Sequence, residues 1–175
     1  MNWFKRRHTP DPVTVQLRDG EYHPFGILGS CVPLSSAETR LYRAVREAVP
    51  VVDAAIYKLI RMTGGVNAVC TDRQAQKALS EFLRTVPTGR GQYGINAFLD
   101  CYLDSLLTCG RAVGEIVPRR DGRDIAALLC GRVEDIEIRE GEHPLAFTIC
   151  GPDESGRMEP LPHQELLLFT PLNPE

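Results

Sequence analysis

The chain has 175 residues, enough for one domain with a substantial core. Its hydrophobic content of 43% and charged content of 25% are ordinary for a globular protein. The net charge of −3 argues against a general attraction to nucleic acid or to an anionic membrane. No apolar run approaches the length of a membrane span. The basic start MNWFKRRH lacks the apolar run that a secretory signal requires.

The six cysteines form no C-x-x-C pair, and most have apolar neighbours. They are Cys31, Cys70, Cys101, Cys109, Cys130 and Cys150. We expect reduced cysteines that act as small core residues, in preference to disulfides or a zinc site. A cytoplasmic compartment follows from that expectation.

Residues 1–35 are predicted to be an irregular N-terminal arm. Its basic cluster, residues 5–7, indicates either a contact with nucleic acid or a neighbouring subunit, or a solvated tail, which we favour. Alternation of Val13, Val15 and Leu17 with polar residues allows a short strand.

A helix is predicted from Ser35 or Ser36 to about Met62, with one apolar stripe. The stripe consists of Leu41, Val45, Val49, Val52, Ile56 and Leu59. Pro50 should kink or break this helix near Val49. Asp53 could be a catalytic acid, but a surface position or a salt bridge, beside Arg46 or Lys58, is the better interpretation.

A short strand over Val66–Cys70 and a helix over Arg73–Val86, capped by Asp72, come next. The expected buried face of that helix is Ala75, Ala78, Leu79, Phe82 and Leu83. The following TGRGQYG loop could bind phosphate through its amides. It lacks the order G-x-x-x-x-G-K-[ST], so a flexible loop is preferred.

The central stretch, residues 93–135, predicts a helix, a stop, a strand, a turn and a second strand. The apolar face of the helix is Ile95, Phe98, Leu99, Tyr102, Leu103, Leu106 and Leu107. Gly110 should form a left-handed cap. Ala112–Val117 and Ile125–Leu129 are the strands, joined at Asp121–Gly122.

Strands are also expected at Asp135–Arg139, Pro144–Cys150 and Glu165–Thr170, the last apolar enough for burial on both faces. The order predicts an α+β fold: long helices, then a mostly antiparallel sheet with helices on one face.

Glu115 could be a buried functional acid. A half-exposed position or a cross-strand arginine partner is more usual. The acids Glu134, Asp135, Glu137, Glu140 and Glu142 predict a solvated edge in preference to a metal site.

The stretch AVGEIVPRRDGRDIAALLCGRVEDIEI, after a helix that closes on Cys-Gly, resembles the wing region of tailed-phage portal proteins. Residues 49–56 resemble the early apolar helix of that family. HQELLLFTPL, residues 163–172, resembles the strand that precedes the portal stem. The resemblance covers roughly residues 36–175, which we take as a portal wing-like α+β domain. It rests on element order and hydrophobic pattern.

The resemblance implies a structural subunit of the ring at the capsid vertex, through which DNA is packaged and ejected. Such rings usually have about twelve subunits. It also implies terminase, capsid and connector proteins as partners, and location in the virion and, during assembly, in the bacterial host cytoplasm. The family's stem and clip would follow Leu172, so the chain is expected to be a truncated wing piece without direct DNA contact. No membrane contact is expected.

No catalytic, cofactor-binding or metal-ligating residue is assigned, because no local signature such as G-x-S-x-G or H-E-x-x-H occurs and the four histidines lack helical metal spacing. We therefore expect a protein that is not an enzyme and needs no cofactor. The alternative is a free-standing small α+β binding or regulatory domain, and an enzyme whose site forms only in the fold is a third reading. A pocket with converging polar groups would favour the binding domain. An exposed final strand with unpaired apolar surface would favour the portal interpretation.

Overall fold

The computed structural model describes residues 16–17, 35–140, 146–153 and 155–172. The helices are α1 (Ser35–Ala48), α2 (Pro50–Thr63), α3 (Arg73–Thr85) and α4 (Ile95–Cys109). The strands are β1 (Pro87–Gly89), β2 (Gln92–Tyr93), β3 (Arg111–Pro118), β4 (Ile125–Gly131), β5 (Glu137–Glu140), β6 (Phe147–Pro152), β7 (Met158–Pro160) and β8 (Leu167–Pro171). Two 3₁₀ turns are η1 (Val133–Asp135) and η2 (Gln164–Leu166).

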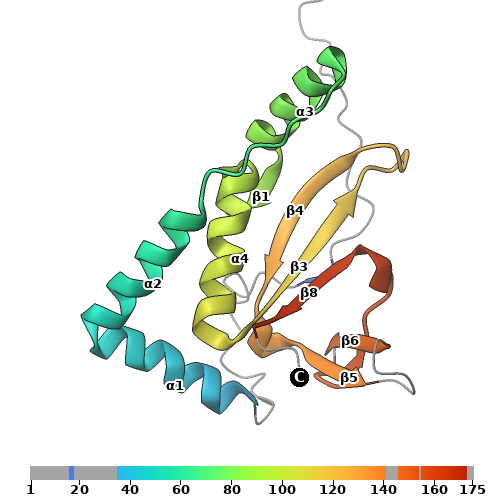
Figure 1. Ribbon diagram of the computed structural model, residues 1–175. Coiled ribbons are helices and arrows are strands. Elements are labelled where there is room, and N and C mark those ends of the chain that lie inside the picture. The colour runs from blue at the N-terminus through green and yellow to red at the C-terminus, as the bar shows by residue number, and fades with distance from the viewer. Residues whose placement is uncertain (1–15, 18–34, 141–145, 154, 173–175) are drawn as a thin grey trace, which may run out of the picture.

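The fold is α+β, and every strand pairing among the described residues is antiparallel (Figure 1). The strands form three small sheets, ordered β4-β3-β8, β5-β6-β7 and β1-β2. The α+β prediction is therefore confirmed. Its single sheet is divided because β8 returns to pair with β3 and leaves β5, β6 and β7 as a separate sheet.

The central stretch forms as predicted. Helix α4 ends at Gly110, whose φ of 73° gives the left-handed cap. Glycine adopts this conformation without a Cβ penalty. Strands β3 and β4 form a long hairpin whose tip contains Asp121 and Gly122.

The core has two parts, one on each face of β3. Phe98 of α4 packs with Val86 and Leu128 on one face. On the other face, Val113 packs with residues of the second sheet and with Leu17 from the N-terminal segment. The full second cluster is Leu17, Val113, Val133, Ile136 and Ile149. Strand β3 is thus the layer common to both parts of the core.

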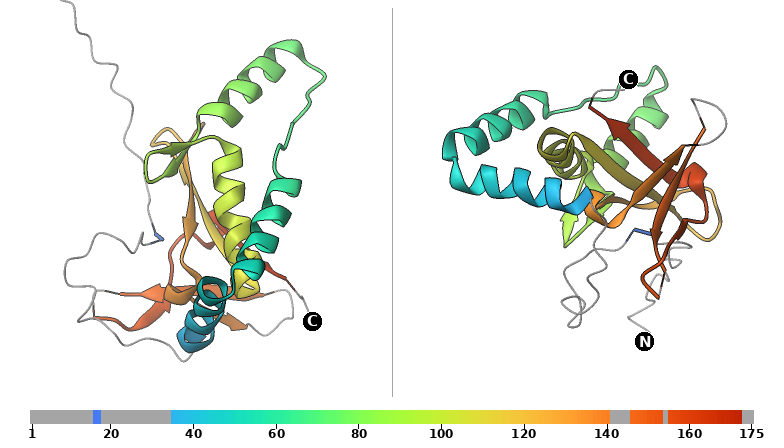
Figure 2. Two further views of the ribbon diagram at one scale, coloured as in Figure 1. Left: turned by 90° about the vertical axis from the view of Figure 1, so that its left-hand side faces the viewer. Right: turned by 90° about the horizontal axis from the view of Figure 1, so that it is seen from below.

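The predicted break at Pro50 is confirmed, because Val49 leaves the helical conformation and separates α1 from α2. The two helices form a V that lies beside α4 (Figures 1 and 2). The break also splits the apolar stripe. Four of its six residues are exposed: Leu41 (60%), Val45 (41%), Val49 (39%) and Leu59 (50%).

The buried face predicted for α3 is only partly confirmed. Asp72 caps the helix through the Ala75 amide as expected. Leu79, Phe82 and Leu83 are half-buried, and Phe82 packs on the Phe98 cluster. However, no residue of α3 is fully buried, and Ala75 and Ala78 are exposed. The α3 helix projects beyond the sheets, where the chain supplies little surface to cover it (Figure 1).

Several other element predictions need correction. Residues 66–70 form no strand with the described part of the chain. The Gln76 side chain accepts from the Cys70 amide and donates to the Ala68 carbonyl instead. The presumed flexible loop is the β1–β2 hairpin. Strand β7 was not predicted. Strand β8 is an edge strand that is half-buried at Leu167–Phe169 and exposed at Thr170 and Pro171, where burial on both faces was expected.

Some sequence predictions fall outside the described residues. These are the basic cluster at residues 5–7, the strand over Val13 and Val15, and the first two residues of the strand expected at Pro144–Cys150.

Gly131 tests the packing between β3–β4 and the N-terminal segment. A Cβ there would lie 2.8 Å from Leu17 Cδ1 and 2.9 Å from Val113 Cγ1. We expect Gly131→Ala to lower the free energy of unfolding by about 1–3 kcal/mol, because the added methyl overpacks the core. Gly64→Ala is the control, since its Cβ would make ordinary contacts at 3.5 Å. Urea unfolding of both variants measures the difference, and equal stabilities would contradict the packing described.

Candidate functional site

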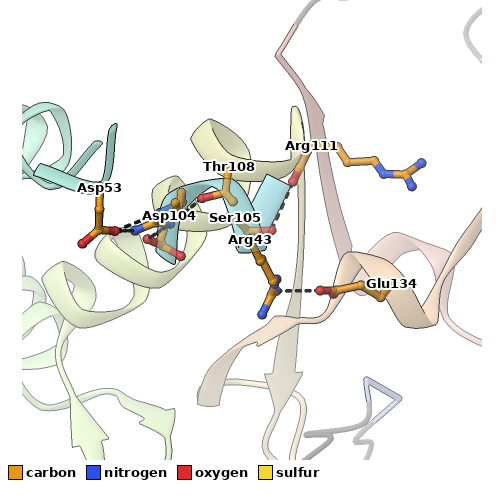
Figure 3. Close-up of polar contacts among 8 residues, drawn as sticks. Arg43, Asp53, Asp104, Ser105, Thr108, Arg111 and Glu134 are labelled. Carbon is orange, nitrogen blue, oxygen red and sulfur yellow. Dashed lines mark hydrogen bonds and ion pairs between the residues drawn. The ribbon is translucent and has the colours of Figure 1, made fainter. Parts of the chain in front are cut away.

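A cluster of polar side chains joins α1, α2 and α4, and we call it the Arg46 junction. Its members are Arg46, Asp53, Tyr57, Asp104 and Thr108. The Arg46 Nη2 lies 2.6 Å from Asp53 Oδ1, and Nη1 lies 2.8 Å from Asp104 Oδ1. Nη1 also donates to the Thr108 hydroxyl, and the guanidinium carbon lies 5.6 Å from the Tyr57 ring centroid. Figure 3 shows Asp53, Asp104 and Thr108 converging on this point.

The local sequence explains why these groups meet. Arg46 lies in the last turn of α1 and Asp53 in the first turn of α2. The break at Pro50 folds the two turns toward each other, so residues seven apart come into contact. Asp104 and Thr108 are four residues apart on α4, and that spacing places them on one face of the helix.

The Arg46 guanidinium is largely buried, with 12% of its side chain exposed, whereas Asp53 and Asp104 are 40% and 43% exposed. Burial acts to lower the pKa of Arg46, but the hydrogen bonds to Asp104 and Asp53 outweigh it and the pKa is raised. The junction therefore holds a permanently charged arginine between two carboxylates that water still reaches.

A polar groove of about 670 Å³ surrounds the junction. It is lined by residues of all three helices, including Glu47, Ala54, Ser105 and Cys109. Burial, followed by the charge of Glu134, raises the pKa of the Cys109 thiol, which keeps it protonated and a poor nucleophile. The groove is thus lined by three acids and two arginines, Arg46 already contacts the Tyr57 ring and both aspartates, and the cysteine is not activated.

A second polar contact joins α1 to the sheet region. Arg43 Nη2 lies 2.7 Å from Glu134 Oε1, as Figure 3 shows. Glu134 is only 7% exposed, so the expected solvated acidic edge is wrong at this position. Asp135 and Glu137 are partly exposed, as that expectation required. Helix α1 is therefore connected to the body mainly through arginine side chains.

Glu115 is fully buried at 0% exposure, which contradicts the half-exposed position expected for it. Nor does it face a cross-strand arginine, because the register places Leu129 and Leu167 opposite it. Its carboxylate instead accepts hydrogen bonds from the Gln16 and Leu17 amides at 2.8–3.0 Å. The acid attaches the N-terminal segment to β3, which is a structural role.

The predicted ion pair of Asp53 with Arg46 is confirmed. The convergence of Asp104 and Thr108 on the same arginine was missed, because those residues lie about sixty positions away. An arginine and an aspartate on either side of a helix-breaking proline were the available signal.

The cysteine prediction is partly corrected. No disulfide joins the five cysteines that the structure describes, but only Cys150 is fully buried and Cys101 is exposed.

Within the described ranges, no three His, Cys, Asp or Glu side chains gather as metal ligands. No helix in the described part of the chain has the length and apolarity needed to cross a membrane.

Comparisons of the chain with protein-family models, with curated proteins and with solved structures found no match.

Arg46→Ala tests the junction. We expect the free energy of unfolding to fall by about 2 kcal/mol, because two carboxylates lose their partner and the three helices lose a common contact. Arg61→Ala is the control, since Arg61 is exposed in the last turn of α2, and a change below about 0.5 kcal/mol is expected. Equal losses in urea unfolding would show that the junction does not stabilise the helices.

Glu115→Gln tests the attachment of the N-terminal segment. The amide keeps the shape but offers one acceptor oxygen and a donor group, so one backbone amide loses its bond. We expect a loss of about 1–3 kcal/mol. Hydrogen exchange of the Gln16 and Leu17 amides should accelerate in the variant. Unchanged exchange would contradict a role for the carboxylate.

Proposed function

We propose that the chain is a structural subunit of the portal type, built to pack against other subunits and not to catalyse a reaction. The observation that carries this proposal is the apolar surface that α1 and α2 turn away from their own core. The exposed large apolar residues are Leu41, Tyr42 and Val45 on α1, Val49 between the helices, and Val51, Tyr57, Leu59 and Met62 on α2.

The sides of α1 and α2 that meet the body explain this surface. Helix α1 meets it through Thr39, Arg43 and Arg46, so its polar side faces inward. Helix α2 uses Val52, Ile56 and Ile60 on its less exposed side, yet its other side is also apolar. A helix that is apolar around most of its circumference is normally buried. We therefore expect a partner subunit to bury the second apolar side of α2.

The final strand gives further support. Among the residues that the structure describes, strand β8 pairs with β3 on one edge only, and Leu172 beyond it is 48% exposed. An open edge with adjacent apolar surface is a common site of assembly. Portal subunits extend their chain from this strand, and the sequence resemblance placed β8 at that point.

The proposal implies the same partners as those of the portal family. The subunit would associate with its own copies in a ring, with terminase, capsid and connector proteins bound to the complete ring. DNA would pass through the ring without direct contact to this wing region. The sites of action would be the virion and, during assembly, the cytoplasm of a bacterial host.

The groove at the Arg46 junction favours a second candidate, a small binding or regulatory domain. Its lining contains one more acid than arginine, with Glu47, Asp53 and Asp104 against Arg43 and Arg46, and this excess suits a small cationic ligand. A cationic compound that raises the melting temperature of the wild-type chain, but not that of an Asp104→Asn variant, would support this candidate.

Self-association tests the structural proposal. We expect the purified chain to form oligomers in sedimentation velocity experiments. The double substitution Leu59→Ser and Met62→Ser should weaken the association constant at least about tenfold, because each buried apolar side chain contributes about 1.5–3 kcal/mol. Tyr93→Ser is the matched control, because Tyr93 is 65% exposed on β2, outside the α1–α2 surface. A wild-type chain that stays monomeric would overturn the proposal.

A further inference from the structure

We propose that the exposed face of α2 packs head-to-tail on the acidic end of a second copy of this chain. We call Val51, Ala55, Leu59 and Met62 the α2 stripe, and β5, β6, β7 and η2 the acidic end. This inference rests on the proposed structural function and adds to it the two surfaces that meet.

The α2 stripe is a continuous apolar surface. Its residues recur at steps of four, four and three, which places them on one side of the helix. Val51 and Met62 are 71% and 73% exposed, and Leu59 is 50% exposed. At about 100° per residue, Lys58 borders the stripe, roughly 20° from Val51, and Arg61 lies further round the same side, roughly 80° from Val51; both are exposed. The surface is therefore apolar with a basic fringe.

Charge is divided unevenly along the chain. Residues 35–85, which contain α1, α2 and α3, carry eight lysines and arginines and five acids. Residues 133–172, which contain the acidic end, carry nine acids and two arginines. The α1–α3 part is thus positive. The acidic end itself carries Glu137, Glu140, Glu159 and Glu165 against Arg139, so it is negative.

This division argues against a symmetric contact. If two copies met through the same α2 face, Lys58 and Arg61 would approach their own counterparts, and like charges in an interface are unfavourable. If the α2 face meets the acidic end of another copy, the same residues approach carboxylates. Charge complementarity therefore favours the head-to-tail arrangement.

The acidic end also has an exposed apolar side chain, Phe147, that the stripe would contact. Phe147 of β6 is 48% exposed, with its ring 5.6 Å from that of Phe169. Glu159 of β7 and Glu165 of η2 are exposed on the same end. Helix α2 and the β5-β6-β7 sheet lie on opposite sides of the molecule (Figures 1 and 2). One copy can therefore use both surfaces at once and extend an assembly.

Two charge-reversal variants of the full chain test the arrangement. Variant A carries Lys58→Glu and Arg61→Glu, and variant B carries Glu159→Lys and Glu165→Lys. We expect each variant alone to associate at least about tenfold more weakly than wild type, because like charges then meet across the contact. An equimolar mixture should regain association, since each surface of A is then opposite in charge to the matching surface of B.

Variant B separates the possible outcomes. In a symmetric contact through α2, variant B keeps the native contact surface and should associate as strongly as wild type, and that result would overturn the head-to-tail proposal. A contact that is unchanged between about 0.05 and 0.5 M salt would also overturn it, because screening should weaken opposite charges. A wild-type chain that does not self-associate would instead remove the structural function on which the inference rests. Circular dichroism confirms that each variant is folded.

Discussion

The Arg46 guanidinium is the contact on which the arrangement of the helices depends. It bonds to Asp53 on α2 and to Asp104 and Thr108 on α4, and through them it connects three helices at one point. A charged group has to be enclosed by polar partners, so the inner sides of α1 and α2 near this point are polar. On α1 the apolar residues Leu41 and Val45 are consequently left on the outer side, whereas α2 packs Val52, Ile56 and Ile60 inward and is apolar on its outer side as well. The Arg46 junction therefore accounts for the exposed apolar side of α1, and the apolar circumference of α2 accounts for the exposed side of that helix.

Glu115 has the corresponding role in the sheet region. A buried carboxylate is costly unless donors surround it, and the Gln16 and Leu17 amides supply those donors. Their position brings Leu17 into the core between the two sheets. The glycine at position 131 leaves the space that the Leu17 side chain occupies. The acid, the glycine and the N-terminal segment therefore depend on one another, although they lie far apart in the sequence.

The portal proposal rests on the order of elements and on exposed apolar surface. The helix, the cap, the hairpin and the final strand on which the resemblance is based occur in the predicted order. Under the proposal, the exposed apolar residues of α1 and α2 would be the surface that neighbouring subunits cover. The groove at the Arg46 junction gives the binding-domain alternative its own physical basis.

The sequence alone determined where helices and strands begin and end, because those boundaries depend on the backbone chemistry of single residues. Pro50 lacks an amide proton and breaks the helix, Gly110 accepts a positive φ and caps α4, and Asp121–Gly122 turns the β3–β4 hairpin. Only the tertiary structure decided which faces are buried. The periodicity of α1 and α3 indicates an apolar side but carries no information on whether anything covers it. The partners of Glu115 lie about a hundred residues away, and Asp104 meets Arg46 across more than fifty. Such pairings are selected by the packing of the whole chain, and no local pattern encodes them.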